Sequence, residues 1–283
     1  MKKQTGRAYL KIFLGVLAAA FSAAPGSSFA GGMEELRGGS VAGFNYLSPA
    51  AIAAIAAEAT AIVGDDPLSD QSNFDPEDLV SGQISYLTPE QVQTPGFPAP
   101  PAAGSTEAKS DLAAVLQWQK DRTSAQCAAA RAQANASYDS FFGDISPFPS
   151  PMPSAVAAFF QRVQGDAGAA DHYLKNLHQR PRPFQNNSSV HPCVNGVGGF
   201  SYPSGHAAAA HIFGLVLSGL KPQQGAEFMA AADQGALNRV IAGVHYPSDI
   251  EAGKRLSDIV YKEFQQNPAF VADLKAVKKY LSK

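Results

Sequence analysis

From Ser110 to the C-terminus, apolar and polar residues follow the spacing of helices, and the alternating patterns typical of strands are scarce. Residues that suit a helix start precede several of these segments, and Ser248 with Glu251 three positions later matches a capping box. The predicted helices are Ser110–Ala136 and Ala155–Leu177 (with Ser110 and Ser154 as caps), Ser204–Leu220, Gly225–Ala242, one that begins at Ser248, and Ala269–Leu281. The fold class is therefore predicted to be all-α, a single helical-bundle domain.

The residues that precede this helical part differ in composition. Residues 31–108 are rich in Ala, Gly and Pro and contain no His or Cys. One helix is predicted there, with Ser48 as its cap, Pro49 at its first position and its end at Gly64, and the segment Pro95–Pro101 is expected to be extended. We expect residues 31–108 to form an irregular N-terminal arm packed on a helical domain that covers residues 109–283.

The N-terminus is typical of an export signal. Four basic residues precede an apolar stretch over residues 12–24, and the small residues Ser28 and Ala30 suit a signal peptidase. The basic residues are Lys2, Lys3, Arg7 and Lys11. The alternative is a membrane anchor, but the apolar stretch is shorter than the roughly 20 residues that a span needs. Residues 1–30 are therefore predicted to be a signal peptide of a periplasmic or secreted protein.

The net charge and the hydropathy of the chain limit the kinds of partner that the sequence predicts. The net charge is −2, and removal of residues 1–30 makes it more negative, so neither nucleic acid nor an anionic membrane surface is an expected partner. The most apolar later run, Ala207–Leu220, contains His211 and is too short for a span, which predicts a buried helix. Cys127 and Cys193 are expected to form a disulfide after export, although two buried thiols that never meet are the alternative.

The candidate chemistry lies in the last part of the helical domain, because all six histidines fall between His172 and His245. Three segments stand out there: a lysine seven residues before an Arg-Pro, a Pro-Ser-Gly-His run, and an Arg and a His followed by an Asp. They are Lys175 to Pro183, Pro203 to His206, and Arg239 to Asp249.

The Pro-Ser-Gly-His segment has the features of an anion site. Ser204 suits an N-cap, so the free N–H groups of Gly205 and His206 are expected to point outward from the helix start. Gly205 lets an oxyanion approach the backbone, and His206 can give a proton to a group that leaves the anion.

The other two segments supply a nucleophile and positive charge. A carboxylate at Asp249 can accept a hydrogen bond from one ring nitrogen of His245, which leaves the other nitrogen free to attack. Lys175, Arg182 and Arg239 can together neutralise a phosphoryl group and the charge that builds up on it during transfer.

Taken together, Lys-x6-Arg-Pro, Pro-Ser-Gly-His and Arg-x5-His-x3-Asp resemble the signature of the type 2 phosphatidic acid phosphatase superfamily. This superfamily includes the bacterial class A non-specific acid phosphatases and the vanadium haloperoxidases. The signature covers about 75 residues, in the expected order, with 19 residues between Pro183 and Pro203 and 31 between His206 and Asn238. Three segments in the right order make a coincidence improbable.

The resemblance implies a role for each matched residue in a helical enzyme that hydrolyses phosphate monoesters without a cofactor or metal. His245 is the expected nucleophile, His206 the acid and then the base, and Asp249 the residue that orients His245. The residues expected to hold the phosphoryl oxygens are Lys175, Arg182, Arg239, Ser204 and Gly205. The family usually has Ser where this chain has Asn238, and Thr follows the motif histidine in many class A enzymes where this chain has Ala207.

Two other functions remain open at this point. A vanadium-dependent haloperoxidase would use a similar pocket with vanadate at His245, and a non-catalytic protein would only bind phosphate. A zinc site is disfavoured because the chain has no His-Glu-x-x-His and no paired Cys spacing. The remaining histidines are expected to be surface or packing residues. They are His172, His178, His191 and His211.

Overall fold

The structure is a computed structural model, and it describes residues 84–282. The predicted signal peptide, the predicted helix after Ser48 and most of the predicted arm lie outside these residues. The helices are α4 (Pro89–Val92), α5 (Thr106–Asp121), α6 (Ser124–Ala132), α7 (Tyr138–Phe142), α8 (Ser154–His178), α9 (Pro183–Asn186), α10 (Gly205–Leu220), α11 (Gly225–Ile241), α12 (Pro247–Gln266) and α13 (Pro268–Lys278). Short 3-10 turns cover Gly143–Ile145 and Pro222–Gln224. Residues 84–282 contain no strand, and the fold is all-α as predicted.

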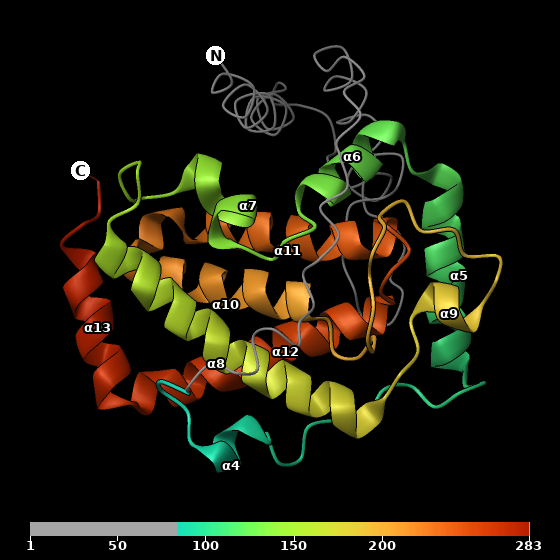
Figure 1. The fold of residues 1–283 in the computed structure, drawn as a ribbon, viewed down its shortest axis with the longest axis horizontal. Coiled ribbons are helices and arrows are strands. Elements are labelled where there is room, and N and C mark those ends of the chain that lie inside the picture. Colours follow the sequence, from blue (N-terminus) through green and yellow to red (C-terminus); the bar gives the residue numbers. More distant parts are fainter. Residues whose placement is uncertain (1–83, 283) are drawn as a thin grey trace, which may run out of the picture.

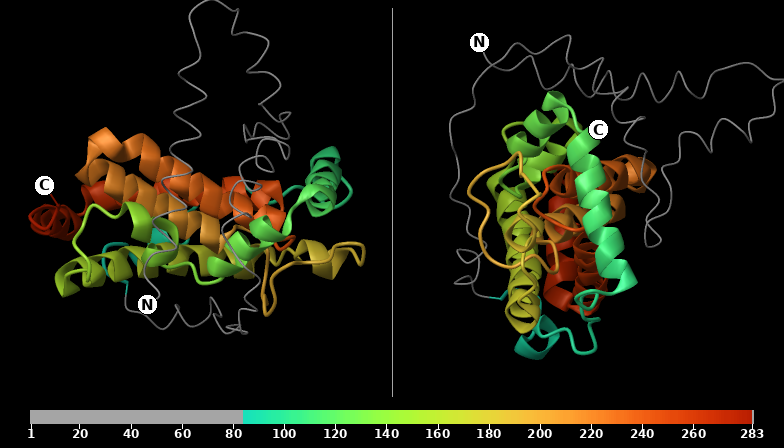
Figure 2. Two further views of the ribbon diagram at one scale, coloured as in Figure 1. Left: turned by 90° about the horizontal axis from the view of Figure 1, so that it is seen from above. Right: turned by 90° about the vertical axis from the view of Figure 1, so that its right-hand side faces the viewer.

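Helix α10 lies at the centre of the bundle, as its apolar sequence predicts. It packs against α8, α11 and α12, and its alanines and larger apolar side chains are buried (Figure 1). Figure 2 shows the same arrangement from two further directions, with α5 at one end of the bundle and α13 at the other. The N-terminus of α10 is therefore enclosed by other elements, which allows it to form the floor of a site.

A small residue brings α12 unusually close to the start of α10. A Cβ atom at Gly253 would lie 2.5 Å from the carbonyl oxygen of Ser204 and 3.0 Å from the Cβ of Ala207. A side chain at Gly253 would therefore push α12 away from the segment that the sequence marks as an anion site.

Two predicted helix boundaries are wrong. The predicted helix Ser110–Ala136 is two helices: α5 begins four residues earlier with Ser105 as its cap, and Thr123 caps α6. The break is at Arg122, whose guanidinium donates to the carbonyl oxygen of Ile241 at 2.9 Å. Thr123 and Gln126 form a capping box at the start of α6, so the break also has a local signal, which the prediction of one continuous helix overlooked.

The fifth predicted helix also begins differently. α12 starts at Pro247, and the residue that closes its first turn is Asp249, which accepts the N–H of Tyr246 at 2.8 Å. The capping box predicted at Ser248 and Glu251 is therefore wrong. At α8 the predicted cap Ser154 is the first helical residue instead, and Pro153 precedes it.

Residues before α5 pack on the bundle in an irregular path. The carboxylate of Asp166 on α8 accepts the N–H groups of Ser85, Tyr86 and Leu87 at 2.7–3.0 Å. Pro95 and Gly96 form a turn, and residues 97–102 follow without regular structure.

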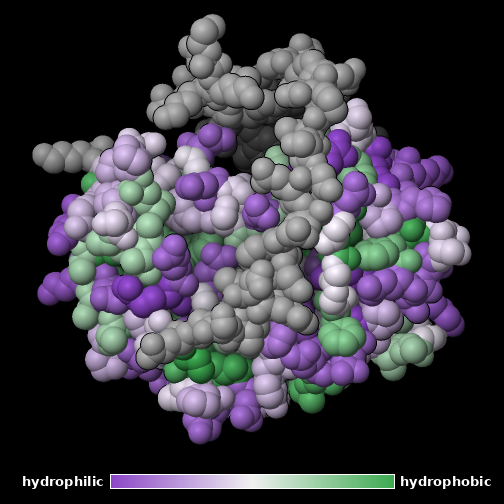
Figure 3. Space-filling view, viewed as in Figure 1, coloured by the Kyte–Doolittle hydropathy of each residue, from purple (hydrophilic) through white to green (hydrophobic). Residues whose placement is uncertain are grey.

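Apolar side chains fill the interior, and the surface is mainly polar. Polar and charged residues cover most of the described part of the face in Figure 3, with smaller apolar areas between them. Within residues 84–282, no helix combines the length and the apolar character that crossing a bilayer requires.

Cys127 and Cys193 form a disulfide, as expected. It joins α6 to the segment before Val194, across 66 residues of sequence. Replacement of both cysteines by serine is expected to lower the free energy of unfolding by about 4 kcal/mol, because a closed loop of this size restricts the unfolded chain. Urea unfolding of this variant beside the oxidised and reduced wild type measures the loss, and an unchanged midpoint would contradict it.

Candidate active site

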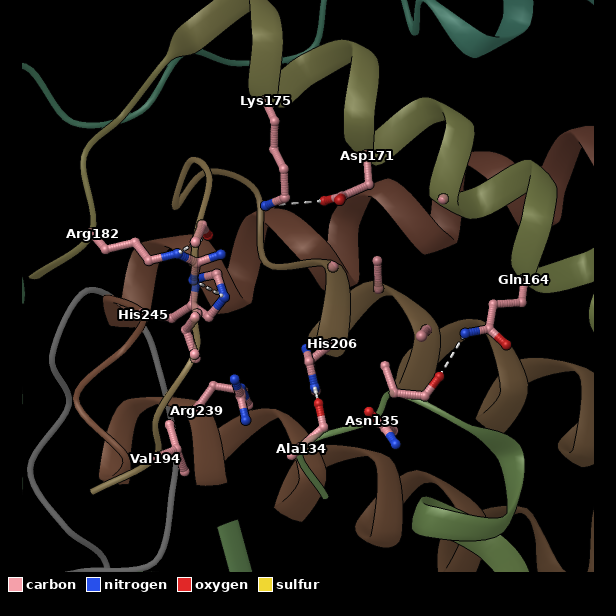
Figure 4. Close-up of a pocket in the computed structure, with 18 of the residues that line it drawn as sticks. Ala134, Asn135, Gln164, Asp171, Lys175, Arg182, Val194, His206, Arg239 and His245 are labelled. Carbon is pink, nitrogen blue, oxygen red and sulfur yellow. Dashed lines mark hydrogen bonds and ion pairs between the residues drawn. The ribbon is translucent and has the colours of Figure 1, made fainter. Parts of the chain in front are cut away.

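A small cavity of about 80 Å³ lies at the N-terminus of α10 (Figure 4). Its walls come from α8, α10, α11, the segment after α6, the glycine-rich segment 194–198 and the loop before α12. The disulfide ties two of these walls together, since Cys127 lies on α6 and Cys193 immediately precedes the glycine-rich segment.

The structure brings the predicted site residues together at this cavity. The predicted residues that line it are Lys175, Arg182, Gly205, His206, Arg239 and His245. Ser204 and Asp249 lie behind the wall: Ser204 is fully buried and its hydroxyl caps α10 by accepting the N–H of Ala207 at 3.3 Å. His206 and His245 are the histidines that line the cavity among residues 84–282.

His245 is held with one ring nitrogen toward the cavity. Its Nδ1 lies 3.3 Å from the Oδ2 of Asp249, and its Nε2 lies 3.0 Å from the NH1 of Arg182. The guanidinium can only donate, so Nε2 carries the lone pair and Nδ1 carries the proton that Asp249 accepts. Burial, followed by the charge of Arg182, lowers the pKa of His245 well below its usual value, which keeps the ring neutral.

Asp249 is itself fixed by several donors. It accepts the N–H of Tyr246, the hydroxyl of Ser201 and the NH1 of Arg180, the last at 2.6 Å. Arg180 also pairs with Asp111 on α5 at 2.8 Å. The carboxylate therefore keeps one orientation toward His245.

Sequence reasoning missed this supporting network. Arg180 lies two residues before Arg182 in an Arg-Pro-Arg sequence. This proximity to Arg182 is the one feature of the sequence that could have indicated a role for Arg180 at the site. Asp111 and Ser201 carry no local signal, because their partners are distant in sequence.

Arg182 keeps its positive charge available to the cavity. Its Nε donates to the carbonyl oxygen of Gly198 at 2.7 Å, and its NH1 donates to that of Val244 at 3.1 Å. Carbonyl groups orient the guanidinium without neutralising it, and burial lowers its pKa to about 10.

Arg239 is the most unusual side chain of the site. It is 2% exposed, and its Nε and NH1 atoms have no hydrogen-bond partner among the described residues. Burial and the charge of Arg182 lower its pKa to about 9. A buried guanidinium without partners is costly, and it is found where a ligand completes its hydrogen bonds.

Lys175 adds a third cation from α8. Its Nζ donates to the carbonyl oxygen of Pro203 and lies 3.6 Å from the Oδ1 of Asp171. Asp171 also lines the cavity, and the sequence analysis did not single it out. The one feature of the sequence that could have indicated a role for Asp171 is its position one helical turn before Lys175.

His206 is the second residue of α10, and its ring is held at the cavity wall. Its Nε2 donates to the carbonyl oxygen of Ala134 at 2.8 Å. Burial, followed by the charge of Arg239, lowers the pKa of His206 well below its usual value. The ring therefore readily gives up a proton that it holds.

Asn238, which stands where the superfamily usually has Ser, lies outside the cavity wall. Asn238 donates to the Oε1 of Gln133 at 2.7 Å and accepts from the Nε2 of Gln234 at 2.9 Å. Gln133 immediately precedes Ala134, so Asn238 supports the segment that holds His206.

The fold and the cavity define a helical protein with a buried site suited to a small anion, and comparisons with known proteins agree. The PAP2 superfamily model matches residues 156–257, which run from α8 into α12. Over these residues, which include the start of α10 and the predicted site residues from Lys175 to Asp249, the chain is similar to this superfamily.

Named relatives resemble parts of the chain. The non-specific acid phosphatase of Salmonella typhimurium is 34% identical over 116 residues, which are 38% of this chain and 45% of the relative. The corresponding enzyme of Providencia stuartii is 31% identical over 83 residues, 29% of this chain and 34% of the relative. The lipid A 1-phosphatase of Rhizobium johnstonii is 31% identical over 124 residues, 44% of this chain and 47% of the relative. The chain thus spans less than half the length of these relatives.

Proposed function

We propose that this protein is an exported acid phosphatase that hydrolyses phosphate monoesters through a phosphohistidine on His245, without a metal ion. The observation that carries the proposal is that the Nε2 lone pair of His245, which lies beside Arg182, faces the same cavity as Arg239, whose Nε and NH1 atoms have no hydrogen-bond partner among the described residues. The similarity to non-specific acid phosphatases supports it. The predicted signal peptide would direct the enzyme to the periplasm or the medium.

Binding uses the cations and the start of α10. Lys175, Arg182 and Arg239 surround the cavity with positive charge, and the N–H groups at the start of a helix have no intrahelical partners. Phosphoryl oxygens can accept hydrogen bonds from all of these groups. These donors suit an anion, whereas a metal ion would need carboxylates or neutral ligands in their place.

In the first step, the Nε2 of His245 attacks phosphorus and forms a P–N bond while the ester P–O bond breaks. The proton of Nδ1 stays with His245, and Asp249 stabilises the cationic ring. His206 gives its proton to the oxygen of the departing alcohol. The two guanidinium groups stabilise the charge on the phosphoryl oxygens during transfer.

In the second step, His206 takes a proton from a water molecule as the water oxygen attacks phosphorus. The P–N bond breaks, His245 returns to its neutral form, and inorganic phosphate leaves. The cycle needs His206 protonated and His245 neutral at the start. A bound phosphoryl anion favours the proton on His206, because it offsets the charge of Arg239.

The mature protein is expected to hydrolyse p-nitrophenyl phosphate in excess EDTA, with a rate maximum on the acidic side of neutral. The lowered pKa of His245 keeps the nucleophile neutral in moderate acid, whereas the lowered pKa of His206 makes its proton scarce as pH rises. The rate should therefore fall toward alkaline pH and again in strong acid, which kcat/KM from about pH 4 to about pH 9 measures.

Four results would contradict parts of this proposal. A flat profile would argue against paired histidines, and activity that EDTA removes and a divalent metal restores would argue against metal independence. No hydrolysis, together with bromide oxidation when vanadate and peroxide are added, would identify a haloperoxidase instead. Phosphate binding without either activity would identify a binding protein.

A further inference from the structure

Asp171 is a carboxyl group in a cavity whose other charged side chains, among the described residues, are the cations Lys175, Arg182 and Arg239. It lies on α8 at the cavity wall and is 3% exposed. Its Oδ1 has no hydrogen-bond partner among the described residues. The nearest positive group is the Nζ of Lys175, 3.6 Å away, beyond hydrogen-bond distance (Figure 4).

The second carboxyl oxygen lies against the start of α10. A Cβ atom at Gly205 would be 2.9 Å from the Oδ2 of Asp171, so the absent side chain leaves room for the carboxyl group there. Phosphoryl oxygens bound to the first N–H groups of α10 would therefore lie beside Asp171.

The groups around Asp171 carry both signs of charge. Lys175 lies on its own helix, Arg182 before α9, Arg239 on α11, and the neutral rings of His206 and His245 on α10 and before α12. Asp249 lies behind His245 and is already saturated by its own donors. Burial raises the pKa of Asp171, and Lys175 opposes that shift.

An ionised carboxylate beside a fully ionised phosphoryl group would repel it, while its Oδ1 would remain without a donor. A single proton between the two groups removes both costs. A protonated phosphoryl oxygen can donate to Asp171, or a protonated Asp171 can donate to a phosphoryl oxygen. Both arrangements hold the same number of protons and form the same O–H···O contact.

We propose that Asp171 and the bound phosphoryl group share one proton, so that the cavity takes up phosphate together with a proton and disfavours fully ionised anions such as sulfate. This selectivity rests on the phosphate site of the proposed function. Phosphate monoesters gain their second charge near pH 6, so they supply or accept the shared proton in mildly acidic solution. Sulfate carries no proton under these conditions, so it can form the same contact only after the carboxyl group of Asp171 takes a proton from solution.

Calorimetric titrations with inorganic phosphate and with sulfate test the proposal without any need for catalysis. The wild type is expected to bind phosphate at least about tenfold more tightly than sulfate, because like charges in contact are strongly unfavourable. At mildly alkaline pH, inorganic phosphate is mainly HPO4²⁻, which brings the shared proton itself. Titrations in two buffers of different ionisation enthalpy should therefore show no net proton uptake with phosphate and uptake of about one proton with sulfate.

Asp171→Asn is expected to change this selectivity. The amide has nearly the same shape and can donate to a fully ionised oxygen, so sulfate affinity should rise about tenfold, and proton uptake with sulfate should disappear. Asp139→Asn, an exposed carboxyl on α7, should leave both anions unaffected.

Some outcomes would overturn the proposal. These are equal binding of the two anions by the wild type, no binding of either, or a change of both affinities by the same factor in Asp171→Asn. If the variant does not fold, the titrations of the wild type decide, and sulfate binding without proton uptake rejects the proposal. Failure of hydrolysis with intact phosphate selectivity would reject the proposed function and leave the role of Asp171 standing.

Discussion

Replacement of His245 by alanine is expected to lower kcat for p-nitrophenyl phosphate by a factor of about 10⁴ or more. The variant lacks the ring nitrogen whose lone pair lies beside Arg182 at the cavity, and His206, the other histidine among the described residues that line the cavity, serves in proton transfer in the proposed mechanism. Arg182, Arg239 and Lys175 remain in place, so phosphate should still bind. A kinetic comparison with the wild type measures the loss, and calorimetry with phosphate checks the binding.

The matched control is His211→Ala, which removes a histidine that pairs with Asp258 and lies outside the cavity wall. It should retain wild-type activity. If His245→Ala kept more than about a tenth of the wild-type kcat, a different nucleophile would be at work.

The proposed covalent intermediate gives a second check on the same residue. His206→Ala removes the acid of the first step and the base of the second, but p-nitrophenolate can leave without protonation. Phosphoenzyme should therefore accumulate when p-nitrophenyl phosphate labelled in the phosphoryl group is added. The label should be lost in acid, as expected of a P–N bond, and it should be absent from a variant that lacks both histidines. A label that is stable in acid would contradict attack by His245.

The central helices and the cluster of charged residues could be predicted from the sequence. α10 and α11 match their predicted ranges to within a residue, because long apolar segments with a good cap or a glycine start are local signals. The spacing of Lys175, Arg182, His206, Arg239 and His245 sufficed to predict one site, and the structure brings all five to one cavity.

What the sequence did not reveal depends on distant contacts. The break between α5 and α6 is an exception, because the capping box of Thr123 and Gln126 is a local signal that the prediction overlooked. Arg180 orients Asp249 from a separate segment, and its partner Asp111 lies about 70 residues away. Asp171 was missed for the same reason: on a helix, a carboxylate one turn before a lysine usually indicates an exposed ion pair.

Arg239→Met is expected to lower kcat/KM about 10²- to 10³-fold and, in phosphate-free buffer, to make the fold more stable by about 1–4 kcal/mol. The pKa of Arg239 falls to about 9, which means that folding disfavours its protonated form and that this cost is present at every pH below that value. Methionine fills a similar volume without a charge, so the variant removes the cost together with the contacts to phosphate. Loss of activity and gain of stability should therefore come from the same atoms.

Thermal unfolding with and without inorganic phosphate separates this explanation from simple damage to the fold. Phosphate should raise the Tm of the wild type, because it binds only the folded state, and should raise that of Arg239→Met much less. Arg255→Met, an exposed residue on α12, is the control, and its activity, Tm and response to phosphate should match those of the wild type. A variant at Arg239 that is less stable than the wild type in phosphate-free buffer would show that the guanidinium supports the fold rather than waiting for an anion. The expected result would show that the buried charge of Arg239 destabilises the ligand-free protein and that bound phosphate compensates for this loss of stability. Such a balance is typical of preorganised electrostatic sites.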